Sequence, residues 1–466
     1  MPAKSLLFVP LTAINPLDGR YRTDIEILSP FISEYALIKT RVEVEALYLF
    51  TLSENTVIRP LTGNEKKILT ALYEDFSLDD AMRVKQIEDE TKHDVKAVER
   101  IFREKLHKTS LADCMEMIHF GLTSEDINNL SYRLMLERAM TQVINPAIKE
   151  IINHLLTLTQ TYKMLPMLAR THGQPAIPTT LGKELVVFAD RLTKELIILQ
   201  KHRLSGKLNG AAGNYNALAV AYPKIDWQEV SNDFVASLGL MPNPVTTQIN
   251  TYEDIISLFQ ILQRVNLILL DLDQDMWRYI SDLWFVQEVR EKEVGSSTMP
   301  QKINPIRFEN SEGNIGIANA LLEFFVRKLP VSRLQRDLSD STVMRNTGAA
   351  LAYSLLAYKN TLGGLLRVKP NEEQIRNDLH KDWSILTEAV QTILRKEGVK
   401  DSYSLIKSLS RGKHITSSDW MTWVTTLPVK DSIKTTLKKL TPETYIGLAP
   451  KIVDQAIKDL ENLNKT

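Results

Sequence analysis

Three polar stretches hold the residues of this chain that are best suited to chemistry. The longest runs from Gly295 to Asn314 and reads GSSTMPQKINPIRFENSEGN. Pro300 and Pro305 exclude a continuous helix there, because proline lacks an amide donor and restricts the residue before it. We expect Asn304 to cap a helix that has Pro305 in its first position. Lys302, next to the free amides and positive dipole of that helix end, favours a bound anion.

The second stretch, RTHGQPAIPTT at 170–180, reads as a loop and holds the best candidate for proton transfer. His172 can exchange a proton near neutral pH. The alternative is a histidine that only satisfies loop backbone, just as the longer stretch can be an ordinary surface loop. In the third stretch, GLTSED at 121–126, either Thr123 or Ser124 can cap a helix whose first turn is acidic.

The sequence gives no sign of a metal or a cofactor. Its histidines and its single cysteine lack the spacing of metal ligands. The glycine-rich segment GKLNGAAGNYNA at 206–217 lacks the pattern of a phosphate-binding loop and follows no predicted strand. We expect a tight turn there, and neither a metal nor a cofactor in the protein.

Long helices must position these polar stretches. Apolar residues recur at spacings of three and four along most of the chain, and alternating strand patterns are missing. The longest pattern covers 251–289 without glycine or proline and predicts a helix of about 40 residues. The other predicted helical stretches are 33–53, 64–105, 124–164 with a kink at Pro146, 181–204, 305–328 and 339–363.

This pattern predicts an all-α protein with three parts. A central bundle of long helices covers 113–364 and carries the polar stretches, and smaller helical domains cover 1–112 and 365–466. Helices as long as the one predicted at 251–289 belong to bundles that associate with other bundles. Such association can bring polar stretches from different copies together.

Composition excludes several classes of function. The 466 residues include 57 Lys+Arg and 57 Asp+Glu, so charge gives no reason to expect nucleic acid or a charged membrane surface as a partner. The lone Cys114 excludes an internal disulfide and fits a reducing compartment. The apolar run before Pro10 is too short for the core of a signal peptide. No uninterrupted apolar run approaches the roughly 20 residues of a membrane-spanning helix. We therefore expect a soluble, cytoplasmic protein.

Several motifs carry a resemblance to a known family. RTHGQPAIPTT and GSSTMPQKINPIRFENSEGN resemble the fumarase/aspartase superfamily, whose members eliminate fumarate from substituted succinates. NPLDGRY, KHDVKAVE, GLTSEDINN and SRLQRDLSDSTVMRN narrow the resemblance to the adenylosuccinate lyase family of the longer bacterial type. The resemblance covers essentially the whole chain. It implies β-elimination of fumarate from adenylosuccinate and from the succinylated aminoimidazole carboxamide ribotide of purine synthesis.

The resemblance also implies catalytic roles. A proton must leave the carbon beside a carboxylate, which puts two negative charges on one group and requires fixed positive charge there. By resemblance Ser296 is the base, activated as its loop closes, and Lys302 stabilises the charge that develops. His172 protonates the departing nitrogen, and Glu309 orients the imidazole of His172.

Further positions match the substrate contacts of the family. Lys92 stands where asparagine is more common, so its contact with substrate stays open, whereas Gln301 replaces a frequent histidine between motif positions. The positions that match phosphate contacts are Arg20, Tyr21, Arg336, Ser341 and Arg345. The positions that match other substrate contacts are His93, Asp94, Thr123, Ser124, Gln248, Ser297, Asn304 and Asn310.

The resemblance implies a homotetramer whose active sites are shared between subunits, with a small nucleotide as substrate and neither nucleic acid nor a membrane as partner. Two alternatives stay open. One is another fumarate-releasing lyase such as argininosuccinate lyase, although the phosphate-matching arginines argue against it. The other is a catalytically silent structural protein of the crystallin kind, although Ser296, His172 and Lys302 are all present.

Overall fold

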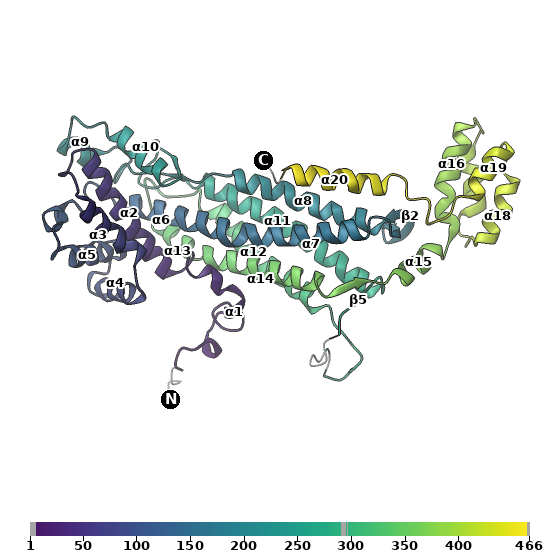
Figure 1. Ribbon diagram of the computed structural model, residues 1–466, viewed down its shortest axis with the longest axis horizontal. Helices are drawn as coiled ribbons and strands as arrows, with labels where there is room; N and C mark the ends of the chain where they lie inside the picture. The colour runs from purple at the N-terminus through teal and green to yellow at the C-terminus, as the bar shows by residue number, and fades with distance from the viewer. Residues whose placement is uncertain (1–5, 290–294, 296, 464–466) are drawn as a thin grey trace. The chain divides into compact units, whose positions relative to one another are not determined.

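The computed structural model describes residues 6–289, 295 and 297–463, and most of them are helical (Figure 1). The all-α prediction is confirmed. The chain forms two compact units. The first comprises Met1–Ala147, Leu196–Leu267 and Gly313–Lys359, and the second comprises Ile148–Glu195, Ile268–Glu312 and Asn360–Thr466. The three-domain division at residues 112 and 364 stays a prediction.

Five long helices contribute residues to both units. Most of them present an apolar stripe to the core, whereas α14 is apolar nearly all round its buried middle, as expected for an interior helix. These helices are α7 (Asn145–Thr161), α8 (Leu181–Lys201), α11 (Glu253–Ser281), α12 (Ile306–Lys328) and α14 (Thr347–Leu365).

The first unit contains further helices, three of which replace the single stretch predicted at 64–105. Each of the three begins at a residue whose side chain accepts from a backbone amide, namely Thr62, Ser77 or His93. The helices are α1 (Arg22–Ile25), α2 (Glu34–Glu54), α3 (Gly63–Glu74), α4 (Leu78–Thr91), α5 (Asp94–Leu106), α6 (Ser124–Ala139), α9 (Asn216–Ala221), α10 (Trp227–Ser237) and α13 (Ser339–Met344). Short helical turns η1 (Pro10–Thr12), η2 (Glu26–Leu28) and η3 (Ala112–Met117) and the parallel pair β3 (Ser205–Gly206) and β4 (Met241–Pro242) complete the unit.

The helix α6 runs into α7 through a π-helical turn, η4 (Met140–Ile144). The kink was predicted at Pro146, which lacks an amide donor. The wider turn directly before it accommodates the missing hydrogen bond.

The second unit ends in a group of short helices, some of which gather together in Figure 1. They are α15 (Glu372–His380), η5 (Trp383–Leu386), α16 (Thr387–Lys396), α17 (Ser402–Ser410), α18 (Ser417–Thr426) and α19 (Asp431–Lys438), followed by α20 (Ala449–Leu463). The unit also contains two antiparallel pairs: β1 (Pro166–Thr171) with β2 (Gln174–Thr180), and β5 (Phe285–Gln287) with β6 (Val368–Pro370).

The helix predicted at 251–289 is shorter than expected. α11 has 29 residues and ends at Ser281. Leu283 has a φ of 61°, a left-handed conformation that stops the helix, and the chain then enters β5. The apolar spacing continued past the helix end because Trp284 and Phe285 are buried as well.

α11 is the helix in the described part of the chain that is long and apolar enough to cross a membrane by length and composition. Its most apolar window has a mean hydropathy of 1.6, and 56% of that window is buried inside the chain. Core helices of non-membrane proteins share these properties, so α11 is weak evidence for a span.

Two glycines of α14 allow α12 to come close. A Cβ atom at Gly364 would lie 2.7 Å from the ring of Phe308, and one at Gly363 would lie 2.5 Å from the guanidinium of Arg307. Both glycines lie inside α14, against the first turn of α12.

Candidate active site

Arg345 follows α13 and is one of the residues matched to phosphate contacts. Its guanidinium donates to Asp94 Oδ2 at 3.1 Å, and the buried Arg41 donates to the same oxygen at 2.7 Å. Burial alone would raise the pKa of Asp94, but the charges of Arg41 and Arg345 hold it below its ordinary value. The cluster therefore contains an ionised carboxylate between two cations, of which Arg345 is the more exposed.

Arg336 is a second phosphate-matching residue and is nearly buried. Its Nη2 lies 3.0 Å from Oε2 of Glu125, and its Nη1 donates to Gln248 Oε1 at 3.3 Å. Gln248 is held in turn by the carbonyl of Ala211 at 3.1 Å. Ser341 lies close by in sequence, and its amide donates to Asp340, the carboxylate on the other side of Arg336.

His93 and Ser124 come from two different helix starts. His93 caps α5 by accepting from the amide of Lys96 at Nδ1, so in the neutral ring the other nitrogen carries the proton. That nitrogen, Nε2, lies 3.5 Å from Ser124 Oγ. The sequence allowed either Thr123 or Ser124 as the N-cap of α6, and the structure shows that it is Thr123.

A fully buried ion pair supports this helix start. Lys207 Nζ lies 3.0 Å from Asp126 Oδ1, and both side chains have no exposed surface. Asp126 also accepts from the amides of Thr123, Asn209 and Gly210. The glycine-rich segment, expected to be only a tight turn, therefore fixes the GLTSED turn through charge and backbone hydrogen bonds.

Arg20 and Tyr21 lie after the NPLDGRY turn in the first unit. The guanidinium of Arg20 lies 5.9 Å from the ring centre of Tyr21, and Arg20 is exposed. The structure records no hydrogen bond from either side chain to Arg336 or Arg345 within the described residues.

His172 lies at the tip of a β-hairpin where the sequence predicted a loop. Thr171 pairs with Gln174, so His172 and Gly173 form a two-residue turn, and their φ values are 53° and 73°. Two positive φ values define the type I′ turn that matches strand twist. The hairpin was not evident from the sequence, because the prolines of 170–180 argue against strands. The backbone thus holds the exposed imidazole at a fixed point in the second unit.

Lys302 and Asn304 lie in the segment before α12. Asn304 donates to the carbonyl of Gly295 at 2.7 Å, and Gln287 of β5 donates to the carbonyl of Ile303 at 3.0 Å. These bonds close the base of the predicted anion-binding segment. The helix begins at Ile306, one residue later than expected. Ser297 is exposed, Asn310 is half-buried and has a partner, and Ser296 lies outside the described residues.

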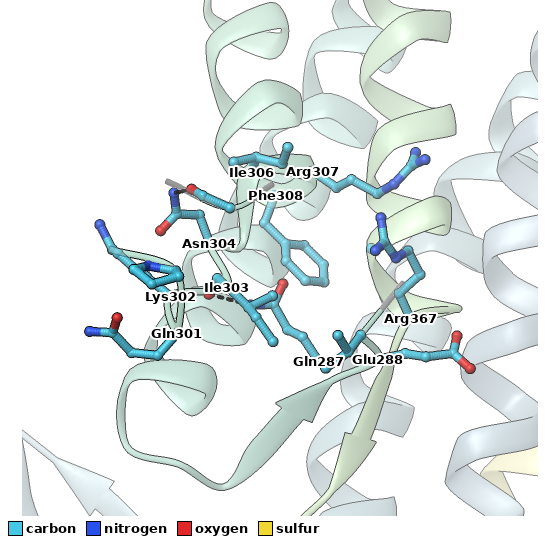
Figure 2. A pocket seen from close by; sticks show the side chains of 14 residues that line it. Gln287, Glu288, Gln301, Lys302, Ile303, Asn304, Ile306, Arg307, Phe308 and Arg367 are labelled. Carbon is cyan, nitrogen blue, oxygen red and sulfur yellow. Dashed lines mark hydrogen bonds between the residues drawn. The ribbon is translucent and has the colours of Figure 1, made fainter. Parts of the chain in front are cut away.

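A cavity of about 490 Å³ lies beside this segment (Figure 2). Lys302 and Arg307 both line it, as do Phe308 and Arg367. Figure 2 shows Lys302 on one side and the two arginines on the other. Lys302, Arg307 and Arg367 line the cavity together with one carboxylate, Glu288, so its lining is positive on balance and suits an anionic ligand.

Glu309 lies in the first turn of α12, where the resemblance gave it the role of orienting His172. In the described part of this single chain its hydrogen bond comes from Trp277 Nε1, at 3.1 Å, and not from His172. Trp277 belongs to α11 and is partly exposed.

Asp273 is a buried carboxyl group that the sequence analysis missed. Thr361 donates to it at 2.9 Å, and Ser311 lies 2.8 Å from the same hydroxyl. Burial raises the pKa of Asp273 well above its ordinary value, so folding favours the protonated carboxyl group. It ties α11 and α14 to the turn of α12 that follows Glu309. A charged residue in the middle of an otherwise apolar helical stripe was the signal that could have found it.

The predicted residues thus fall into two groups. Within the first unit the structure pairs His93 with Ser124, Asp94 with Arg345 and Gln248 with Arg336. The second unit holds His172, Ser297, Lys302, Asn304, Glu309 and Asn310. Among the described residues, His, Cys, Asp and Glu side chains form no group of three that could bind a metal.

Comparison with known proteins defines the class. The sequence matches the family described as Lyase over residues 32–318. Its fold is similar to a fumarate lyase from Mesorhizobium sp. BNC1, with a TM-score of 0.75, 16% identity and coverage of 93% and 97% of the two chains. It is also similar to the 3-carboxy-cis,cis-muconate lactonizing enzyme of Pseudomonas putida, with a TM-score of 0.74, 16% identity and coverage of 95% and 99%. The chain is a lyase with the fumarase/aspartase fold.

The sequence also matches the family described as Adenylosuccinate lyase C-terminal over residues 332–446. Adenylosuccinate lyases of Haemophilus influenzae and of Escherichia coli K12 are each 44% identical over 449 residues, 96% of this chain and 98% of theirs. The enzyme of Dictyostelium discoideum is 47% identical over 453 residues, 94% of this chain and 97% of its own. The chain belongs to the adenylosuccinate lyase family.

Proposed function

We propose that this chain cleaves adenylosuccinate to AMP and fumarate, and cleaves the succinylated aminoimidazole carboxamide ribotide (SAICAR) to AICAR by the same β-elimination. Both reactions belong to purine nucleotide synthesis. The observation that carries the proposal is the pair of arginines, Arg336 and Arg345, each held by a carboxylate in the first unit. Guanidinium groups held in this way fit the phosphate of a nucleotide, which argininosuccinate lacks.

In the proposed reaction Ser296 removes a proton from the carbon next to the carboxylate. The electron pair of the broken C–H bond is held first on the carboxylate, and it forms the new double bond of fumarate when the C–N bond breaks. His172 donates a proton to the departing nitrogen, so charge and atoms balance. Lys302 supplies positive charge where the carboxylate gains electrons, at the cationic cavity beside α12.

We further propose that the active site is shared between subunits of a homotetramer. Two features support this. Glu309 does not contact His172 within the described part of one chain, and large apolar side chains stay exposed along the long helices. Those exposed residues include Val187 and Ile198 of α8, Leu267 and Trp277 of α11, and Ile306, Ile317 and Phe324 of α12.

Fumarate release by the purified protein tests the function. Adenylosuccinate, SAICAR and argininosuccinate are supplied separately, and fumarate is followed by its absorbance. We expect turnover of the first two and none of the third. Turnover of argininosuccinate alone would show that the chain is an argininosuccinate lyase instead. No turnover of any of the three substrates would favour a catalytically silent structural protein. We also propose a cytoplasmic location, which fits the single buried cysteine.

A further inference from the structure

Glu125 lies in the first turn of α6, directly after Ser124, and the proposed mechanism gives it no role. Its side chain is 5% exposed, and its Oε2 lies 3.0 Å from Nη2 of Arg336. A glutamate at this position of a helix would ordinarily face water and the helix dipole. Here it is buried against the guanidinium that we assign to the phosphate.

The other cations near Glu125 are already paired. Arg133 of α6 is bound to Asp254 at 2.9 Å, and Lys207 is bound to Asp126 at 3.0 Å. Within the described residues, Arg336 is therefore the cation that forms an ion pair with Glu125.

A second carboxylate, that of Asp340, lies near the same guanidinium. Asp340 Oδ2 lies 4.0 Å from Nε of Arg336 and accepts from the hydroxyl of Tyr252. Burial, and to a small extent the charge of Glu125, raises the pKa of Tyr132 of α6, whose hydroxyl is buried. Arg336 thus balances more than one carboxylate before any ligand binds.

A phosphate that binds Arg336 competes with Glu125 for the N–H groups of one guanidinium. It also brings about two negative charges close to a buried carboxylate. A buried carboxylate that loses its cation is strongly destabilised unless it takes up a proton. Protonation of Glu125 removes that cost and leaves Arg336 free to bind the phosphate.

We propose that Glu125 is a positioning residue for Arg336, and that binding of the nucleotide phosphate is coupled to proton uptake by Glu125. In the free protein the ionised carboxylate holds the guanidinium in place. In the complex the neutral carboxyl group no longer competes with the phosphate. The inference rests on the proposed function, because that function assigns Arg336 to the phosphate.

The protonation behaviour of Glu125 supports this exchange. Burial raises the pKa of its carboxyl group to about 7, against the opposing charge of Arg336. An added phosphate raises that pKa further, because it opposes the negative form. Above neutral pH the free protein must therefore gain a proton on binding, and its affinity for the nucleotide falls as pH rises.

Titration calorimetry of the full-length protein with AMP tests the coupling. Binding heats are measured at about pH 7.5 in two buffers of different ionisation enthalpy, where the phosphate itself is almost fully ionised. We expect the wild type to take up roughly half a proton per AMP, and Glu125→Gln to take up almost none while still binding AMP. The same uptake in both proteins, or none in the wild type, would overturn the proposal.

Two further measurements keep the test decisive. Glu43→Gln removes a carboxylate that pairs with Arg138 at 2.7 Å outside this cluster, and it should leave the uptake unchanged. If Glu125→Gln fails to fold, the wild type alone decides: its AMP affinity should fall by up to about tenfold per pH unit above pH 7.5. A flat profile would exclude the coupling. Turnover of adenylosuccinate, measured separately, shows whether the proposed function has failed instead.

Discussion

Arg345 donates to Asp94 across two helix ends, from the residue after α13 to the first residue of α5, at 3.1 Å. Both residues match substrate contacts of the family. The carboxylate also receives Arg41, which is almost completely buried, so Asp94 keeps a cation when Arg345 turns to a ligand. Asp94 therefore holds Arg345 in place in the free protein and still lets it bind a ligand.

Replacing Arg336 or Arg345 with alanine should weaken AMP binding at least about tenfold, and fumarate binding far less. Each arginine can give a phosphate two parallel hydrogen bonds, which neither alanine nor lysine can. Inhibition constants of AMP and fumarate in each variant provide the measurement, with Arg345→Lys as the control that keeps the charge. Unchanged AMP affinity in both alanine variants would show that the phosphate assignment is wrong.

His172→Asn tests proton donation by His172 while it preserves the backbone turn at that position. Asparagine adopts the left-handed conformation of a type I′ turn readily, but it cannot donate a proton as an acid. Turnover should therefore fall at least about 100-fold, with the thermal midpoint little changed, and Ser296→Ala should show a similar loss. A folded His172→Asn protein with near-normal turnover would remove His172 from the mechanism.

Mixing inactive variants tests whether subunits share a site. His172→Ala and Ser296→Ala proteins, each nearly inactive, should regain activity when mildly dissociated and reassociated together. About a quarter of the sites would then hold both native residues, because each site draws them independently. Each variant treated alone is the control. No recovery, with subunit exchange verified, would place both residues on one chain.

Lys207→Met should lower the free energy of unfolding by roughly 3–5 kcal/mol, since it leaves Asp126 buried without its cation. Lys194→Met is the matched control, because Lys194 pairs with Asp190 at the surface and should cost less than about 1 kcal/mol. Urea unfolding of both variants supplies the comparison. Equal losses of unfolding free energy in the two variants would mean that the buried ion pair contributes no more to stability than the surface pair.

Asp273→Asn should make stability less dependent on pH. Folding raises the pKa of Asp273, so the folded chain keeps a proton that the unfolded chain releases above about pH 4. The wild type should therefore lose stability relative to the variant as pH rises above about 4, the range in which only the folded chain keeps the proton. Thermal midpoints of both proteins at pH 5 and pH 8 would reveal this. A constant difference between them would contradict a buried neutral carboxyl group.

The helices could be predicted because their signals are local. Spacing of three and four located α2, α8 and α14, whereas the sequence left the cap of α6 open between Thr123 and Ser124 and the structure places it at Thr123. The end of α11 could not be predicted, since the apolar pattern continued into buried residues of β5. The hairpin at His172 could not be predicted for a different reason. Its prolines oppose strand formation, and its turn depends on a histidine with positive φ.

The candidate site was only partly accessible from the sequence. Motifs pointed to Arg336, Arg345 and His172, because these residues lie in long specific segments. Glu125 lies inside the GLTSED motif but received no role, and Asp273 lies in none of the motifs, since burial against particular partners sets the properties of both. Those partners lie far away in the chain, and a sequence of helices does not reveal which of them will meet.

The glycine pair of α14 limits how this enzyme can be stabilised by engineering. Glycine inside a helix is a usual target, because replacement by alanine gains about 0.4–1 kcal/mol where the new methyl group has room. At Gly364 that methyl group would press against Phe308, the residue before Glu309. Alanine at this position of α14 would therefore displace the first turn of α12. Thermostable variants should keep Gly363 and Gly364 and gain their stability elsewhere.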